Sequence, residues 1–158
     1  MTITVRPADE GDADTISALN NAVQDIHAKA LPWRFKPASA ATFPPSEVRQ
    51  LIADHRNLVF VAHVDGAPAG YVYAEVIRRP ETSRHFAYSM LYIHQISVEP
   101  GIRGQGVGSA LVGAVQSAGK ELGITILALD TWSFNETARS FFRKLGLKAY
   151  NERLWNVR

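Results

Sequence analysis

The sequence predicts an α/β (α+β) domain in which a mixed, mostly antiparallel sheet of six to seven strands carries helices on both faces. Segments with apolar residues three or four positions apart alternate with short β-branched segments, in the order β-α-α-β-β-β-α-β-α-β. The three central strands follow one another without a helix, so they are expected to be antiparallel neighbours. With 46% apolar and 20% charged residues the chain can bury a core, and residues 1–158 are expected to form a single domain.

The first third of the chain predicts one strand and two helices around an irregular segment. Residues 3–6 alternate in polarity and end at a proline, as in a short strand. Asp12 is expected to cap a helix that runs to about Lys29, and Ser46 a second helix. Between the helices, residues 30–45 hold prolines and aromatic residues, so they are expected to form an ordered, partly buried loop.

The rest of the chain predicts a strand meander followed by alternating helices and strands. The meander strands are expected at residues 58–64, 70–77 and 88–98. The helix that follows them stops at Gly123, and the apolar run at residues 124–129 is typical of a strand covered on both faces. Asn135 then caps a fourth helix that Gly146 closes. The tail, residues 147–158, is expected to add one or two final strands.

Composition excludes several classes of protein. The chain has no cysteine, which excludes a disulfide scaffold, a cysteine-ligated metal site and a cysteine-bound acyl intermediate. A formal net charge of +2 gives no reason to expect a nucleic-acid partner. No apolar run approaches the roughly 18 residues of a membrane span, and the first residues do not resemble a signal peptide, so a soluble, cytoplasmic protein is expected.

The strongest functional signal is the segment Arg103-Gly104-Gln105-Gly106-Val107-Gly108, which follows a predicted strand and opens a predicted helix. Alternate glycines remove the Cβ atoms from one side of the turn, so successive backbone N–H groups can point at an anion, and the helix N-terminus adds about half a positive charge. The segment lacks the pattern GxxxxGK[ST], and a dinucleotide fingerprint would need a glycine at Ser109. It therefore predicts another kind of phosphate loop, the alternative being a tight turn that only packs strand against helix.

Two further motifs connect this loop to a known family. The run Val98-Glu99-Pro100 stands before it, and the stretch from Asn135 to Leu147 is similar to the pattern N…A-x-x-F-Y-x-x-x-G-F. Arg103, Gly106 and Gly108 meet the pattern [QR]-x-x-G-x-[GA]. Nearly the whole chain therefore resembles the GNAT superfamily of N-acetyltransferases, which implies a GNAT-like fold with acetyl-CoA, or another acyl-CoA, as co-substrate and no metal.

The resemblance implies where coenzyme A is held. It would lie where the strand at 88–98 splays from the strand at 124–129, with its pyrophosphate on N–H groups from Arg103 to Gly108. Asn135 would hydrogen-bond the pantetheine arm in addition to capping its helix. The cofactor-binding residues expected on this basis are Ile96, Ser97, Val98, Arg103, Gly104, Gln105, Gly106, Val107, Gly108, Ser109, Asn135, Ala138, Phe141 and Phe142.

The resemblance also implies the reaction, which is acetyl transfer to a primary amine by direct attack in a ternary complex. A backbone N–H near Val98 would stabilise the oxyanion. His94 stands where many members have an acidic base, four positions before the valine of V-x-P. Histidine can take up a proton at neutral pH, although a hydrogen-bonded core histidine is an equal alternative. Glu75 is the second candidate base, or it pairs only with Arg78 or Arg79.

The clearest departure from the family concerns the leaving thiolate. Phe142 stands in place of the usual tyrosine acid, and a phenyl ring has no proton to give. Tyr150 is the expected substitute, with Tyr92 and Tyr88 as alternatives, so the expected catalytic residues are His94, Glu75 and Tyr150. The alternative function is a non-catalytic acyl-CoA-binding sensor domain, which Phe142 and the lack of an acidic residue at position 94 favour.

The acceptor is expected to be a small-molecule amine or a protein amino group, with a homodimer left open. By the resemblance, residues 30–45 and 78–86 would shape its site. Trp33, Phe35 and Phe43 would line a pocket, and arginines would hold a carboxylate or phosphate. These arginines are Arg34, Arg78, Arg79 and Arg84. The alternative is a loop pinned by its aromatic residues beside a solvated basic hairpin.

Overall fold

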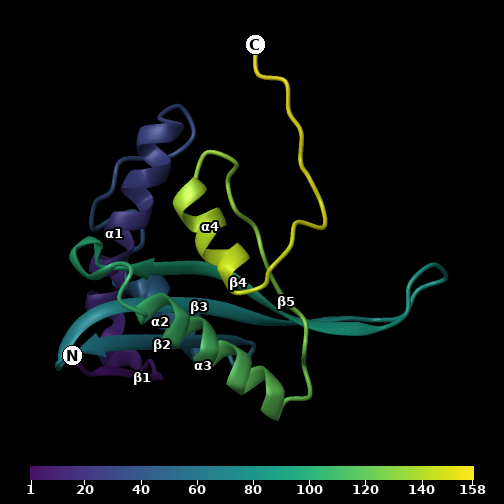
Figure 1. Cartoon of the computed structure of the whole chain (residues 1–158), viewed down its shortest axis with the longest axis horizontal. Coiled ribbons are helices and arrows are strands. Elements are labelled where there is room, and N and C mark those ends of the chain that lie inside the picture. The colour runs from purple at the N-terminus through teal and green to yellow at the C-terminus, as the bar shows by residue number, and fades with distance from the viewer.

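The computed structural model describes residues 1–158 and confirms the predicted order of elements as far as the fourth helix. The elements are β1 (Ile3–Pro7), η1 (Glu10–Asp12), α1 (Ala13–Ala30), α2 (Pro45–Ala53), β2 (Asn57–Val64), β3 (Ala67–Arg79), β4 (Tyr88–Val98), η2 (Pro100–Ile102), α3 (Val107–Glu121), β5 (Leu127–Leu129) and α4 (Glu136–Lys144). Figure 1 shows the strands as one central sheet, with β3 and β4 extending beyond it as a long hairpin. No helix combines the length and apolarity needed to cross a membrane.

The sheet has five strands in the order β1-β2-β3-β4-β5. The first four are antiparallel neighbours, and β5 lies parallel to β4 because α3 carries the chain back between them. The sheet is therefore mixed and mostly antiparallel, as predicted. The prediction of six to seven strands is wrong, because the tail at residues 147–158 forms no strand and leads away from the sheet (Figure 1).

The fifth strand is also shorter than expected. The sequence predicts a covered strand over residues 124–129, but only Leu127–Leu129 pair with β4, and Ile126 is exposed. So short an edge gives the tail little to pair with, and a strand cannot form without a partner. The apolar run at 124–129 reflects the burial of Ile124 beneath α3 rather than a full strand.

Each face of the sheet carries its own hydrophobic core. On one face α1 and α2 cover β2 and β3, and the core between them includes Ile16, Leu19, Phe43, Val48 and Tyr71. On the other face α3 and α4 cover the sheet, and the core between helices and sheet includes Val72, Leu91, Leu111, Val115 and Phe142. Helices therefore lie on both faces, as the sequence predicts, and burial of the two apolar surfaces stabilises this arrangement.

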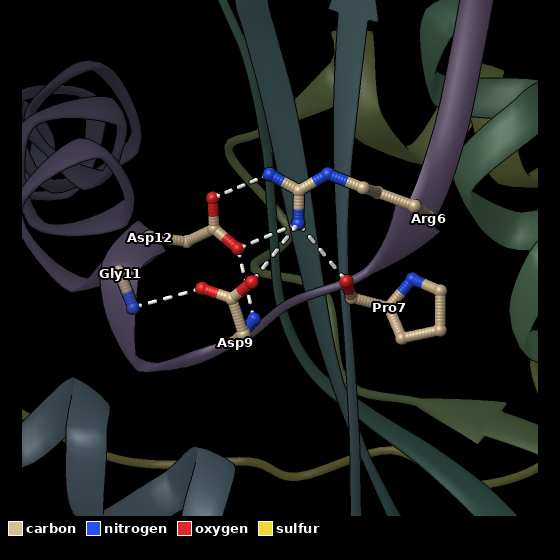
Figure 2. A network of polar contacts seen from close by, with 5 residues as sticks. All are labelled: Arg6, Pro7, Asp9, Gly11 and Asp12. Atoms are coloured by element: carbon tan, nitrogen blue, oxygen red, sulfur yellow. Dashed lines mark hydrogen bonds and ion pairs between the residues drawn. The ribbon is translucent and has the colours of Figure 1, made fainter.

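A polar network fixes the entrance to α1 (Figure 2). The Arg6 guanidinium donates to both carboxylate oxygens of Asp12, at 2.8 and 2.7 Å, and this holds the pKa of the Asp12 carboxyl below its usual range. Asp12 also accepts from the N–H of Asp9 at 2.8 Å. The predicted side-chain cap by Asp12 is therefore wrong, because its oxygens are used by Arg6 and Asp9; Asp9 caps η1 through the N–H of Gly11.

The second helix begins one residue earlier than predicted. Pro45 is its first residue and Ser46 makes no capping hydrogen bond, because proline at the first helical position needs no acceptor for an N–H. The loop before it is ordered and partly buried as predicted, since Phe43 is 3% exposed and stacks on Tyr71.

Candidate active site

The start of α3 presents a row of unpaired backbone donors. Gly104 and Gly106 have φ of 78° and 94°, a left-handed conformation that glycine adopts without strain. Gly106 occupies the N-cap position, where it supplies no side-chain acceptor. The backbone N–H groups of residues 104–109 therefore have no acceptor within the protein. Such a row, at the positive end of a helix dipole, fits a phosphate anion.

The start of α4 differs, because its first turn is capped. Asn135 Oδ1 accepts from the N–H of Ala138 at 3.1 Å, which confirms the predicted N-cap. The side-chain nitrogen of Asn135 makes no hydrogen bond within the protein, so one amide serves the helix and leaves two donors free. Phe141 of the same helix lies against the start of α3, where a Cβ at Gly108 would come 3.0 Å from its ring.

The last part of β4 has a free edge. β5 pairs only with Leu91–Ile93, whereas β4 continues to Val98. The N–H of Glu99 donates to Ala69 beside β3, so by strand alternation the backbone groups of Ile96 and Val98 face the side that β5 has left. The splay between the two parallel strands that the resemblance implies would lie at this free edge. Arg103 closes its far end, where its Nε donates to the carbonyl of Val98 at 3.1 Å.

Ser97 faces the other way. Ser97 pairs with Tyr71 of β3 and is buried, with 4% of the residue exposed. Its hydroxyl donates to the carbonyl of Leu19 in α1 at 2.7 Å. Of the three β4 residues expected to bind the cofactor, Ile96 therefore offers both backbone groups and Val98 its N–H, since the Val98 carbonyl accepts from Arg103. The side chain of Ser97 joins β4 to α1 instead.

A β-bulge lies in the middle of β4. Tyr73 pairs with Gln95 and the next residue, Ala74, pairs with Ile93, so His94 is an extra residue without a partner on β3. A bulge turns a side chain out of the usual alternation. The consecutive residues His94 and Gln95 consequently both face the α1 side of β3, where His94 contacts Tyr73 and Glu75 and Gln95 contacts Tyr71.

His94 and Glu75 form a close pair at this bulge. His94 Nε2 and Glu75 Oε2 are 2.7 Å apart, and the two side chains are 34% and 28% exposed. A carboxylate can only accept a hydrogen bond, so His94 Nε2 carries the hydrogen and Nδ1 of the neutral ring holds the free lone pair. The rings of Tyr73 and Tyr92 lie 4.8 Å from the His94 ring and fix its plane. Glu75 thus pairs with His94, not with the arginines of the hairpin.

A buried relay positions Gln95 next to this pair. Asn20 of α1 donates to the Tyr71 hydroxyl at 2.8 Å, and that hydroxyl donates to Gln95 Oε1 at 2.7 Å. Burial raises the pKa of Tyr71, so it remains a neutral donor. The sequence does not predict the roles of Asn20 and Tyr71, because no local pattern links residues that are far apart in the chain.

Among the three tyrosines named as candidate acids, Tyr92 is the one whose ring contacts His94. Burial and the neighbouring Asp130 carboxylate raise the pKa of Tyr92 to about 12, so it keeps its proton at neutral pH. Tyr150 is 80% exposed in the tail and makes no side-chain hydrogen bond, and Tyr88 is 43% exposed at the start of β4. Phe142 is buried in the core beneath α3. No group of three or more His, Cys, Asp or Glu side chains is arranged to hold a metal ion.

Comparison with known proteins agrees with this geometry. Residues 21–147, more than half of the chain, match the family model described as the acetyltransferase (GNAT) family. The uncharacterized N-acetyltransferase MJ1207 of Methanocaldococcus jannaschii is 31% identical over 94 residues, which are 56% of this chain and 38% of that protein. The chain thus matches well under half the length of this curated relative.

Solved structures share the fold. A tetramutant of the BH1408 protein from Bacillus halodurans has a TM-score of 0.92 at 24% identity, over 98% of this chain and 99% of that chain. The aminoglycoside acetyltransferase meta-AAC0020, from an uncultured soil metagenomic sample and in complex with sisomicin, has a TM-score of 0.68 at 18% identity, over 99% and 95% of the two chains. The expected GNAT-like fold is therefore confirmed.

Proposed function

Because the chain belongs to the acetyltransferase (GNAT) family, we propose that it transfers an acetyl group from acetyl-CoA to the primary amine of a small molecule, by direct attack in a complex that holds both substrates. One observation carries the proposal above the others. The unpaired N–H groups of residues 104–109 adjoin the free edge of β4, so a pyrophosphate site leads into a slot for an extended chain with amide groups.

The donor would be held mainly by backbone groups. The N–H groups of residues 104–109 take the pyrophosphate, Ile96 and Val98 pair with the pantetheine amides as an added strand would, and the Asn135 amide donates to a pantetheine carbonyl. When bound, acetyl-CoA supplies an activated thioester. One of these two N–H groups, on Ile96 or Val98, would donate to the thioester oxygen, where negative charge develops, in place of a pantetheine carbonyl, and such a donor contributes roughly 2.7 to 4 kcal/mol.

His94 would remove the proton from the acceptor amine. Its Nδ1 lone pair takes the proton as the amine nitrogen bonds to the acetyl carbon, and the carbon–sulfur bond breaks to release the coenzyme A thiolate. Glu75 holds the ring in the required tautomer and stabilises the imidazolium that forms, as a carboxylate does beside a catalytic histidine. The two candidate bases thus act as one unit, with His94 as base and Glu75 as its partner.

The leaving thiolate would depart with little help from an acid. Phe142 is buried and carries no proton, but a thiol with a pKa of about 8.5 leaves tolerably as its anion. Tyr92 contacts the His94 ring, while Tyr150 would have to move from an exposed position. Of the two, the geometry favours Tyr92.

A second function rests on Phe142 alone. A chain that binds acetyl-CoA but lacks a proton donor fits a sensor of acyl-CoA as well as a transferase. The paired His94 and Glu75 favour transfer, because a sensor needs no histidine held in a defined tautomer by a carboxylate.

Two measurements test these functions. Titration calorimetry with acetyl-CoA should give one site per chain, and failure to bind would end both proposals. Release of free CoA should then depend on an added amine, and the panel of amines should include sisomicin, the ligand of the structurally similar meta-AAC0020. Binding of acetyl-CoA without amine-dependent release would leave only the sensor.

A further inference from the structure

Four aromatic side chains from three separate segments converge at one end of the molecule. Trp33 and Phe35 follow α1, Trp132 lies between β5 and α4, and Trp155 lies in the tail. The ring centroids of Trp155 are 5.8 Å from those of Trp33 and Trp132, and Trp132 lies 5.5 Å from Phe35. Figure 1 shows the end of α1, the β5–α4 segment and the end of the tail together in the upper part of the view, beyond one edge of the sheet. We call these four rings, together with Arg34, the aromatic platform.

Arg34 lies at the centre of the platform. Its guanidinium carbon is 5.0 Å from the Trp132 ring centroid, 5.7 Å from that of Trp155 and 5.8 Å from that of Phe35. Such contacts hold a guanidinium in place by cation–π attraction. The side chain makes no hydrogen bond or ion pair within the protein, whereas Arg6 and Arg56, for example, pair with carboxylates. Its planar fork of N–H donors is therefore positioned but unused, and it matches a carboxylate.

The platform borders the reactive pair. The last residue pair between β4 and β5 is Ile93 with Leu129, so His94 and Asp130 are the next residues along the two strands. Tyr92 lies next to both: its ring centroid is 4.8 Å from that of His94, and burial together with the Asp130 carboxylate raises the pKa of its hydroxyl. Trp132 follows two residues after Asp130, and two residues span at most about 7 Å. An amine at His94 would therefore have the Asp130 carboxylate, which is 66% exposed and 3.8 Å from the exposed Arg153 guanidinium, and the platform within the length of one small molecule.

We propose that the aromatic platform is the acceptor subsite, and that it takes an amine that also carries a carboxylate and a flat apolar group, as an aromatic amino acid does. The carboxylate pairs with Arg34, the flat group stacks on the tryptophans, and the amine lies toward Asp130 and His94. This inference rests on the proposed function for its reaction. A polycationic aminoglycoside is disfavoured, because Arg34 would meet it with a like charge.

Tryptophan fluorescence gives a direct test, because all three tryptophans of the chain belong to the platform. The protein without acetyl-CoA is titrated with phenylalanine, with phenylalaninamide and with sisomicin. Phenylalaninamide differs from phenylalanine only in lacking the carboxylate. Phenylalanine should change the emission and bind at least about tenfold more tightly than the amide, which is the effect of one charge-assisted bidentate pair. Sisomicin should bind more weakly than phenylalanine.

Three variants assign the preference to Arg34. Arg34→Gln should bind phenylalanine and its amide with equal affinity, and Arg34→Lys, which keeps the charge but not the planar fork, should retain only part of the preference. Arg49→Gln removes one positive charge from the exposed side of α2 and should leave the preference unchanged. No response to phenylalanine, equal affinity for acid and amide, tighter binding of sisomicin, or a preference that survives in Arg34→Gln would each overturn the proposal.

The outcome also separates the subsite from the reaction. Binding of phenylalanine through Arg34 by a chain that does not bind acetyl-CoA would retain the subsite and remove acetyl transfer. If the chain binds acetyl-CoA and releases CoA when sisomicin is added, but Arg34→Gln does not change the preference for phenylalanine over its amide, the transferase is retained and the subsite is removed.

Discussion

The donor side and the acceptor side of the site are built from different material. The donor side, meaning residues 104–109 with Ile96 and Val98, presents backbone groups that one glycine-rich turn and one strand end leave unpaired. The acceptor side, meaning His94, Glu75, Tyr92 and the aromatic platform, presents side chains that a bulge and three distant segments bring together. A backbone site tolerates changes in side chain except at its glycines, whereas a side-chain site changes its specificity with a few substitutions.

The largest effect is expected from His94→Gln on the acceptor side. Glutamine can still donate to Glu75 but cannot take up a proton, so kcat should fall by about 10² to 10⁴, the usual contribution of a general base. Acetyl-CoA affinity, measured by calorimetry, should not change, because the donor side lacks this residue. The dependence of kcat on pH should also flatten. A variant with the kcat and pH profile of the unchanged chain would remove His94 from the reaction.

The next effect is expected from Gly106→Val on the donor side. A β-branched residue is strained at a φ of 94°, by roughly 1 to 3 kcal/mol, and relaxation of the turn would redirect the N–H groups that face the anion. Acetyl-CoA affinity should fall about tenfold or more. Gly101→Val is the matched control, because Gly101 has no positive φ and a Cβ there meets no atom within 4 Å. Equal affinities in two folded variants would contradict the loop assignment.

The same difference explains how much the sequence could predict. The strand at 88–98, the loop and its helix were predictable, because backbone sites depend on local glycine patterns and hydrophobic periodicity. The family and enzyme class predicted from these motifs are confirmed by the family match. The cofactor contacts of individual residues in the loop and in α4 remain predictions.

On the acceptor side the sequence predicted candidates but not their arrangement. His94 and Glu75 were both named as bases, yet their pairing depends on a single unpaired residue in β4, which no residue pattern marks. One or two strands were predicted in the tail, but in the structure the tail forms no strand and Trp155 contacts Trp33 and Trp132. Contacts between segments more than 90 residues apart are set by the fold as a whole.

A smaller effect should separate two roles of one donor-side residue. Asn135→Ala removes the cap of α4 and should lower the free energy of unfolding by about 1 kcal/mol in chemical denaturation. Asn135→Ser keeps a capping oxygen but loses the amide donors, so its stability should stay close to that of the unchanged chain while acetyl-CoA affinity falls as in Asn135→Ala. If Asn135→Ser binds acetyl-CoA normally, the residue is only a cap.

The smallest expected effect is on stability at acidic pH, where the acceptor side should be more sensitive to acid than the donor side. Burial lowers the pKa of His27, whose ring lies 5.0 Å from Phe35 of the aromatic platform, below its ordinary value of 6.5. Between the two pKa values the unfolded chain binds more protons than the folded chain. The stabilisation from neutral His27 is therefore complete above about pH 6.5 and is lost as pH falls through the lowered value.

Thermal unfolding followed by tryptophan fluorescence should accordingly show a Tm that declines with acidity in this window. His27→Phe keeps a ring against Phe35 and should reduce the slope, whereas His55→Gln, at an exposed position, should not. An equal slope in His27→Phe would place the acid sensitivity elsewhere. A reduced slope would show that the platform depends on an uncharged His27, because a protonated ring at the end of α1 would have to stay solvated and could not remain half-buried against Phe35.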